Sequence, residues 1–335
     1  MGRVRQADIA RVAGVSQATV SVVLGGNRAG VRLSERTRLR VLEAAERLGY
    51  VPDPVSSRLM SARNNLLGLY TFTPAFPDIA DGCYPILAGV EAEAAALGKD
   101  LIMFTASSAA PDRIRRTRLA DGCLFLGRHV PVDALAGLLD AGFPLVCIGR
   151  RTELDGRIPH VGADYVTASA EVVGRLARAG HRRVRYLREP DDAPSSGDRE
   201  RGVRGAAADA GLSLAVTRTD GTDLAPATIA GWLADGVTAL VVEETDTSAV
   251  FEGTRRALRA AGVSVPGDVS LAVLGRPPGG TAGPVVSGFE VPRRALGRAA
   301  VRLLASLVEP GTGEPVPHRL LPCPPVAGET IATVA

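Results

Sequence analysis

The chain has 335 residues, of which 46% are hydrophobic and only 4% aromatic, and its formal net charge is +3. This length suffices to bury the cores of two or three domains, and the scarcity of aromatic side chains argues against a stacking surface for single-stranded nucleic acid. Residues 1–63 carry eleven arginines against five acidic residues, whereas the remainder carries 28 basic and 31 acidic residues. A basic head on a slightly acidic body predicts a polyanion partner at one end only.

Three interpretations compete for the segment VSQATVSVVLGGN at residues 15–27: the core of a signal peptide, a core helix, or the second helix of a helix-turn-helix. A secretory core requires about 7–15 unbroken apolar residues, and Ser16, Gln17 and Thr19 interrupt this run. No stretch of the chain reaches the roughly 18 apolar residues of a membrane span. We therefore expect a cytoplasmic, nucleoid-associated protein without membrane contact.

Two helices joined by a glycine turn are predicted near the N-terminus. The first, QADIARVA at residues 6–13, places Ile9, Val12 and Ala13 on one face. Ser16 is a good N-cap for the second helix, because its hydroxyl can accept a hydrogen bond from the amide of Thr19. The residues expected to face inward in this second helix are Val20, Val23 and Leu24, and those expected to face outward are Gln17, Ala18, Ser21 and Val22.

A third helix is predicted after the loop GGNRAGVRL. Ser34 caps its start and Gly49 follows its end. The residues expected to line its inner face are Leu39, Leu42, Ala45 and Leu48. Three such helices form a small core that suits a DNA-binding head, although a plain three-helix bundle without a ligand has the same pattern.

The second helix carries the chemistry of the DNA-binding interpretation. Helix-turn-helix proteins place the N-terminal residues of their second helix against base edges in the major groove. Gln17 can make a bidentate contact to adenine, and Ala18 an apolar contact to a thymine methyl group. The basic balance of the head favours this interpretation over the plain bundle.

Apolar runs alternate with alanine-rich helical stretches after residue 65. The predicted strands are residues 66–72, 100–105, 122–127, 144–149, 182–187, 238–243 and 269–274, and the predicted helices include residues 86–97, 165–179, 199–210 and 249–261. Such alternation predicts parallel sheets with crossover helices. Breaks rich in Gly and Pro near 156–163 and 275–292 suggest two lobes with more than one crossover.

No motif for catalysis or cofactor binding occurs in this body. No GxGxxG follows a predicted strand, and neither GxxxxGK[ST] nor GxSxG is present. The four cysteines show no metal or redox spacing and are expected to be buried free thiols. We therefore expect neither an enzyme nor a cofactor or metal. A dehydrogenase, a hydrolase and a secreted solute-binding protein remain the weaker alternatives.

The runs DIARVAGVSQATVSVVLGG and SERTRLRVLEAAERLGYVPDPVSSRLMS resemble the LacI/GalR family of bacterial transcription regulators. The resemblance implies an all-α helix-turn-helix head, followed by an α/β body of the type I periplasmic-binding-protein fold with two doubly wound parallel-sheet lobes. It also implies binding to double-stranded DNA at a pseudo-palindromic operator, a homodimer or a tetramer, and a small-molecule effector bound between the lobes.

Residues 53–60 match the family's hinge segment, in which Leu59 falls where the family's leucine wedges into the minor groove. An apolar wedge unstacks a base step and kinks the duplex, although a core residue of a linker helix is the alternative. The DNA contacts predicted from the head and the hinge are Ser16, Gln17, Ala18, Thr19, Ser21, Val22, Asn27 and Leu59. The chain departs from the family at Arg5, Val22 and Gly25, so the operator sequence of a relative cannot be transferred.

The resemblance also implies an effector site at the carboxyl ends of the strands, where open α/β sheets bind ligands. Asp164 and Arg199 match family positions in this cleft, and both side chains suit a polyhydroxylated ligand. Asp246 is the best match to a family aspartate, and Arg276 stands where the family has an acidic residue. The predicted set is Phe72, Tyr84, Asp164, Arg199, Asp246 and Arg276. Surface salt bridges are the commoner fate of Asp and Arg, and that alternative stays open.

The predicted organisation is a DNA-binding head at residues 1–50, a hinge at 51–64, and an effector-binding and dimerisation domain at 65–335. Within this domain, lobe 1 is predicted at about 65–162 and 291–321 and lobe 2 at about 163–290 and 322–335. The predicted function is a transcriptional repressor controlled by a sugar or a related metabolite. The alternative is an activator, or a regulator controlled by a partner protein or a non-sugar ligand.

Overall fold

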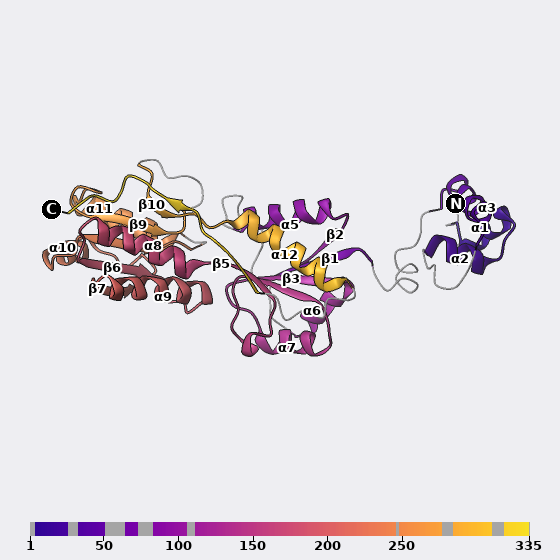
Figure 1. Ribbon diagram of the computed structural model, residues 1–335, viewed down its shortest axis with the longest axis horizontal. Coiled ribbons are helices and arrows are strands. Elements are labelled where there is room, and N and C mark those ends of the chain that lie inside the picture. The colour runs from indigo at the N-terminus through magenta and orange to yellow at the C-terminus, as the bar shows by residue number, and fades with distance from the viewer. Residues whose placement is uncertain are drawn as a thin grey trace. The chain divides into compact units, whose positions relative to one another are not determined.

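The computed structural model describes residues 4–25, 33–50, 64–72, 83–105, 111–245, 248–276, 284–309 and 318–334. The chain divides into two compact units, Met1–Leu66 and Leu67–Ala335. Figure 1 shows the helices α1, α2 and α3 of the first unit in indigo, and the sheets with their covering helices in the later colours. The division into units does not fix the predicted domain and lobe boundaries, which stay predictions.

The first unit is a three-helix cluster of α1 (Gln6–Ala13), α2 (Gln17–Gly25) and α3 (Glu35–Arg47). The side chains of Ser16 and Ser34 cap α2 and α3, since their hydroxyls accept from the amides of Thr19 at 3.1 Å and Thr37 at 3.2 Å. Gly14 ends α1 in the left-handed conformation, with φ of 63°. The caps and the turn thus lie where the sequence predicts them.

The inner faces of α1 and α3 differ from the prediction. The sequence predicts that Val12, Leu39 and Leu42 face inward, but 40%, 52% and 41% of these residues' surfaces are exposed. The buried residues of this core are Ile9, Ala10, Ala13, Val20, Val41, Ala44 and Ala45. A helix turns by about 100° per residue, so the face of α3 that carries Val41, Ala44 and Ala45 points the two leucines toward its flanks. The buried alanines let the three helices approach closely.

Among the described residues, no single helix is long and apolar enough to span a membrane, although the pair Gln6–Ala13 and Gln17–Leu24, bent by 108°, passes the same test together.

The second unit contains two six-stranded sheets. The first has the order β11-β5-β4-β3-β1-β2, with strands β1 (Leu66–Thr71), β2 (Asp100–Thr105), β3 (Gly122–Leu126), β4 (Leu145–Ile148), β5 (His160–Ala163) and β11 (His318–Leu321). The second has the order β12-β10-β9-β8-β6-β7, with β6 (Arg183–Arg188), β7 (Ser213–Arg218), β8 (Ala239–Glu243), β9 (Ser270–Leu274), β10 (Ser287–Phe289) and β12 (Pro325–Val326). The chain crosses between the sheets after β5, after β10 and after β11.

Helices cover both faces of each sheet. In the first, α5 (Tyr84–Ala96) and α12 (Arg293–Val308) pack together on one face, and α6 (Pro111–Arg115) and α7 (Val132–Asp140) lie on the other (Figure 1). In the second, α8 (Tyr165–Arg178) packs on α9 (Pro194–Asp209), and α10 (Pro226–Ala234) and α11 (Ala249–Ala260) share another core cluster. The short 3-10 helices are η1 (Arg116–Leu119) and η2 (Leu154–Gly156). This arrangement confirms the predicted fold class of a helical head and two parallel-sheet lobes.

The seven predicted strands are all present, with ends that differ by a residue from most predictions. The predicted breaks are only partly right, because residues 156–163 contain β5 and residues 275–292 contain β10. The first crossing of the chain to the other sheet therefore begins after Ala163, the last residue of β5, and α8 begins at Tyr165.

Candidate functional site

The first turn of α2 exposes the side-chain amide of Gln17 and the methyl group of Ala18. Gln17 and Ala18 are exposed, whereas Thr19, Ser21 and Val22 are half-buried. The hydroxyls of Ser16 and Thr19 are 2.9 Å apart, and Ser16 also accepts from the Thr19 amide. Ser16 and Thr19 thus hold the start of the helix, and Gln17 and Ala18 are left available at its N-terminus for bases or other partners.

Three of the predicted site residues lie outside the described residues. These are Asn27, Leu59 and Asp246. Their assignments to base contact, minor-groove wedge and effector contact stay predictions.

Arg199 lies on α9 at the carboxyl ends of β8 and β9, and only 4% of its surface is exposed. Its Nε donates to the carbonyl oxygen of Leu274 at 2.9 Å, and its Nη1 lies 3.6 Å from Oε1 of Glu243. The guanidinium carbon lies 3.8 Å from the centroid of the Tyr165 ring. The predicted effector residue is therefore fixed on three sides by the strand ends and by α8.

Glu243, the last residue of β8, is not among the site residues that the sequence predicts. It is 1% exposed, and within the described part of the chain neither of its carboxylate oxygens has a hydrogen-bond partner. The same holds for the hydroxyl of Tyr186 on β6 and for that of Ser196 on α9. Burial, together with the Glu243 carboxylate, raises the pKa of Tyr186 well above its ordinary value of 10. We call Tyr186, Arg199 and Glu243 the buried polar cluster.

Buried polar atoms without partners are costly, so the buried polar cluster offers hydrogen-bonding capacity that the described residues do not use. The sequence does hold a signal for Glu243, because two successive glutamates end the apolar run TALVV. A carboxylate at the end of a strand is usually solvated, and the sequence alone therefore gives no reason to select it.

Asp164 caps α8, since its carboxylate accepts from the amide of Thr167 at 3.1 Å. It directly precedes Tyr165, whose ring centroid lies 3.8 Å from the guanidinium carbon of Arg199. Burial raises the pKa of the Cys323 thiol to about 11. Tyr165 thus links the start of α8 to Arg199.

The remaining predicted effector residues have separate surroundings. The ring of Phe72 stacks on Phe125 with centroids 6.1 Å apart. Tyr84 is 44% exposed at the start of α5, and Arg276 is exposed after β9. Within the described residues, no contact joins these three side chains to the buried polar cluster.

Ion pairs join the two lobes at the carboxyl ends of their strands. Arg128, which follows β3, lies 2.9 Å from Asp191 and 3.1 Å from Glu189, both in the segment after β6. Nε2 of His129 lies 2.7 Å from Asp191. Although burial raises the pKa of Asp191, the neighbouring Arg128 and His129 leave it below its ordinary value.

A second interlobe contact involves Asp198, the residue that precedes Arg199 on α9. Arg150, which follows β4, donates to the carboxylate of Asp198 on α9, and Asp198 is 1% exposed. This hydrogen bond raises the pKa of Arg150 above its ordinary value. A ligand that enters between the lobes would therefore meet fixed charges from both of them.

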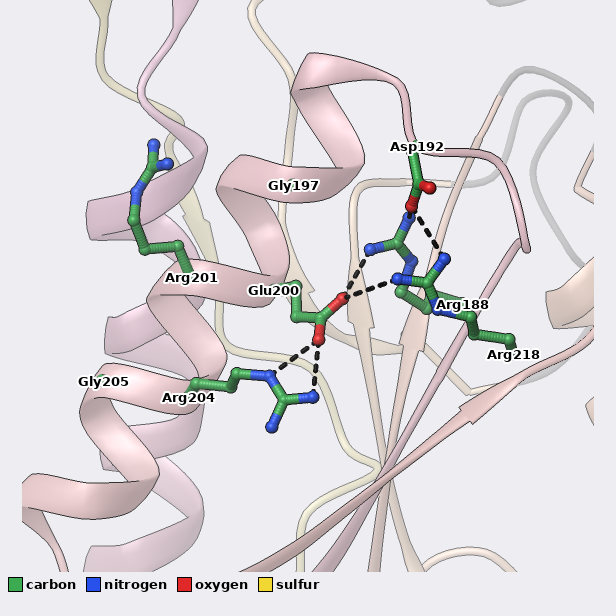
Figure 2. Close-up of a pocket in the computed structure, with 8 residues that line it drawn as sticks. All are labelled: Arg188, Asp192, Gly197, Glu200, Arg201, Arg204, Gly205 and Arg218. Atoms are coloured by element: carbon green, nitrogen blue, oxygen red, sulfur yellow. Dashed lines mark hydrogen bonds and ion pairs between the residues drawn. The ribbon is translucent and has the colours of Figure 1, made fainter.

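A hollow of about 700 Å³ lies at the carboxyl ends of β6 and β7 (Figure 2). Its lining residues are Arg188, Asp192, Gly197, Glu200, Arg201, Arg204, Gly205 and Arg218. Figure 2 shows Glu200 between Arg188, Arg204 and Arg218, and Asp192 beside Arg218. Arg201 pairs with Asp198. Each of the four arginines thus has a carboxylate of this chain as a partner, although only three carboxylates, those of Asp192, Asp198 and Glu200, are shared among them.

Within the described ranges, no group of three or more His, Cys, Asp or Glu side chains could hold a metal ion. The four cysteines are free thiols. Burial, followed by the neighbouring Cys147, raises the pKa of Cys123 well above its ordinary value, so this thiol stays protonated and unreactive near neutral pH.

Two family models match the chain. Residues 7–53 match bacterial regulatory proteins of the lacI family, and residues 173–331 match a periplasmic binding protein-like domain. The HTH-type transcriptional regulator CelR of Thermobifida fusca is 30% identical over 328 residues, which are 92% of this chain and 93% of that protein. Catabolite control protein A of Streptococcus mutans is 32% identical over 189 residues, 55% of this chain and 54% of its own length.

Solved structures share the fold over nearly the whole chain. A complex of the transcriptional regulator CelR with cellobiose has 26% identity and a TM-score of 0.67, and the match covers 98% of this chain and all of that one. The lac repressor dimer bound to operator and the anti-inducer ONPF has 21% identity and a TM-score of 0.75, with 99% and 100% covered.

Proposed function

This chain belongs to the LacI family of bacterial regulatory proteins and is a DNA-binding transcriptional regulator, and we propose that it acts in the cytoplasm as a homodimeric repressor whose operator affinity is set by a sugar bound between its lobes. The observation that carries the proposal is the buried polar cluster at the carboxyl ends of the second sheet. There, Arg199 and Glu243 are buried within 3.6 Å of each other.

The chemistry of the buried polar cluster suits a polyhydroxylated ligand. A guanidinium group donates two parallel hydrogen bonds and a carboxylate accepts them, so vicinal hydroxyls can satisfy both. The unpartnered oxygens of Glu243 and Tyr186 would receive donors from such a ligand. Since the related CelR was solved with cellobiose, a β-linked disaccharide is the first ligand to test, with Asp164 and Asp246 as further contacts.

The interlobe ion pairs supply an element that a ligand can bias. Arg128 with Asp191 and Arg150 with Asp198 hold the strand ends of the two lobes together. A ligand shifts the equilibrium between lobe arrangements only by its differential affinity for them. We propose that this shift reaches the DNA through residues 51–64, in which Leu59 wedges into a central base step.

The head would read the operator through α2. Gln17 and Ala18 contact base edges in each half-site, supported by their exposure at the start of the helix. A two-fold dimer presents two heads, so the operator is a pseudo-palindrome. The related regulators are not enzymes by name, and we propose no catalytic role for this chain.

To test the proposal, cellobiose and other sugars are titrated into the complex of the whole protein with labelled operator DNA, and release or binding of the DNA is measured by fluorescence anisotropy. The wild-type protein responds to one of these sugars. Arg199→Lys keeps the positive charge but loses the paired N–H donors of the planar guanidinium. We expect its half-maximal response to require about tenfold more sugar, because a charged hydrogen bond contributes about 1.5–3 kcal/mol.

Arg204→Lys is the matched control, since Arg204 lies on the same helix and is exposed to solvent. It responds at the wild-type sugar concentration. If Arg199→Lys responds like the wild type, the effector does not use the buried polar cluster. If the operator complex ignores every sugar, the ligand is of another class.

A further inference from the structure

The arginines of the hollow in Figure 2 share their carboxylate partners with one another. Glu200 pairs with Arg188 and Arg204 and lies 4.0 Å from Arg218. Asp198 pairs both with Arg201 of the hollow and with Arg150 of the first lobe. Within the described residues, these five guanidinium groups have only three carboxylates as ion-pair partners, the third being that of Asp192.

The neighbouring acidic residues do not pair with the arginines of the hollow. Glu189 and Asp191 pair with Arg128 of the first lobe. Asp209, the next acidic residue along α9, is exposed, and none of the ion pairs of the described residues includes it. Although burial raises the pKa of Glu200, the hydrogen bonds from Arg204 and Arg188 leave it below its ordinary value, so this carboxylate lies among positive charges.

Three arginines of the hollow keep hydrogen-bond donors that the protein does not use. Nη2 of Arg201 donates to a carboxylate of this chain, as do Nε of Arg204 and Nη1 of Arg218. In the described part of the chain, Nε of Arg201, Nη1 of Arg204 and Nε of Arg218 have no partner. Between 46% and 57% of these side chains is exposed. A ligand that enters the hollow can therefore reach donors on all three.

The hollow also has a fixed charge and open space. Arg188 is only 2% exposed, because its nitrogens donate to Glu200 and to two backbone carbonyl oxygens. A Cβ built at Gly197 or at Gly205, on the exposed face of α9, meets nothing within 4 Å. The volume of about 700 Å³ falls within the range of roughly 300–1,000 Å³ that small-molecule sites occupy.

The hollow is separate from the buried polar cluster but connected to the contact between the lobes. Arg199 belongs to the buried face of α9, whereas Arg201 and Arg204 belong to its exposed face. Asp198, which Arg201 contacts in the hollow, is also the partner of Arg150 in the first lobe. A ligand that draws Arg201 away would leave this carboxylate to Arg150.

We propose that the hollow is a second ligand site, which binds a small molecule that carries a phosphate group. Guanidinium groups suit phosphate oxygens through their planar fork of donors, and a phosphate group offers three acceptor oxygens. It would compete with Asp192 for Arg218. Since the Asp192 side chain is 78% exposed, little stability is lost when it gives way. Such binding requires neither DNA nor a sugar, so it is tested apart from the proposed function.

The test is isothermal titration calorimetry of the whole protein in a phosphate-free buffer of low ionic strength. The probes are inorganic phosphate and glycerol 3-phosphate, with glycerol as the neutral comparison. Arg204→Gln/Arg218→Gln removes two arginines of the hollow. The matched control, Arg178→Gln/Arg259→Gln, removes the same charge from exposed arginines at the ends of α8 and α11 in the same lobe.

The wild-type protein binds both phosphate-bearing probes but not glycerol, and added NaCl weakens the binding. Arg204→Gln/Arg218→Gln binds at least about tenfold more weakly, because it loses hydrogen bonds between charged groups, and the control binds like the wild type. Asp192→Asn removes the competing carboxylate and binds more tightly, by up to about fivefold. A purely structural role of these residues predicts no such gain.

Gly205→Glu gives the same answer if the double variant folds poorly. Its Cβ has free space, and its carboxylate enters the hollow and weakens the binding of both probes. Tighter binding of glycerol 3-phosphate than of inorganic phosphate supports a phosphorylated metabolite, and equal binding supports recognition of the phosphate group alone. The proposal is overturned if the wild type binds neither probe. It is also overturned if the hollow variants bind like the wild type, because the anion then binds elsewhere.

Discussion

We predict that replacing glycine by alanine has opposite effects on stability at two positions of α9. A Cβ at Gly202 would lie 2.3 Å from the carbonyl oxygen of Val166 on α8, whereas a Cβ at Gly205 meets nothing within 4 Å. Both positions gain about 0.5–1 kcal/mol of helix propensity when glycine becomes alanine. At Gly202 the obstructing atom belongs to the backbone, so the two helices must separate, at an overpacking cost of about 1–3 kcal/mol.

Gly202→Ala should therefore lower the free energy of unfolding by about 1–2 kcal/mol, and Gly205→Ala should raise it by about 0.5–1 kcal/mol. Urea unfolding followed by tryptophan fluorescence measures both, because Trp232 is the only tryptophan and is buried in the core of the second lobe. A steric conflict at Gly202 is excluded if Gly202→Ala is as stable as the wild type, or if the two variants shift the urea midpoint in the same direction.

Three further predictions concern the head, the hinge and the first lobe. Gln17→Ala should relax the base preference at one position of each half-site by about 1–3 kcal/mol, measured by competition with operators that vary at each position; an unchanged preference removes Gln17 from the base contacts. Leu59→Ala should lower the affinity for the operator at least about tenfold and leave nonspecific DNA binding unchanged. It should also reduce the bend angle of operator fragments, measured by their gel mobility; a wild-type bend angle would show that residues 53–60 only tether the head. Burial lowers the pKa of His160 from 6.5 to about 4, so as the pH falls the imidazole is protonated in the unfolded state before it is protonated in the folded state. The contribution of the neutral imidazole to the free energy of unfolding is therefore fully present above pH 6.5 and is lost as the pH falls toward 4, by up to about 3 kcal/mol. His160→Gln should lose less stability than the wild type between pH 7 and pH 4.5 in thermal unfolding, and parallel pH profiles would contradict this cause.

Hydrophobic pattern predicted the strands that are buried on both faces, because parallel sheets covered by helices need continuous apolar runs. β8 and β9 are such runs, and both are buried throughout. β5 and β10 are short and lie among glycines and prolines, and each pairs on one side with a strand from much later in the chain. β5, for example, is in register with β11, more than 150 residues away, and no local pattern reports such a contact.

Only part of the candidate site could be predicted from the sequence. Arg199 could be selected because it matches a family position, and the structure shows its partners on β8, β9 and α8. Glu243 could not, since nothing in the sequence distinguishes a buried carboxylate at a strand end from a solvated one. The predicted inner face of α3 was right for Ala45 but wrong for Leu39 and Leu42. These leucines are the larger residues, but the close approach of the helices buries the small Ala44 beside Ala45.

We propose that the protein binds one symmetric DNA site as a dimer, through its two helix-turn-helix heads. Selection of bound sequences from a random duplex library, followed by sequencing, tests it most directly. We expect enrichment of an inverted repeat, with equivalent bases in its two half-sites. Enrichment of a single unsymmetrical site, or of no sequence above the background of phosphate-driven binding, would contradict it.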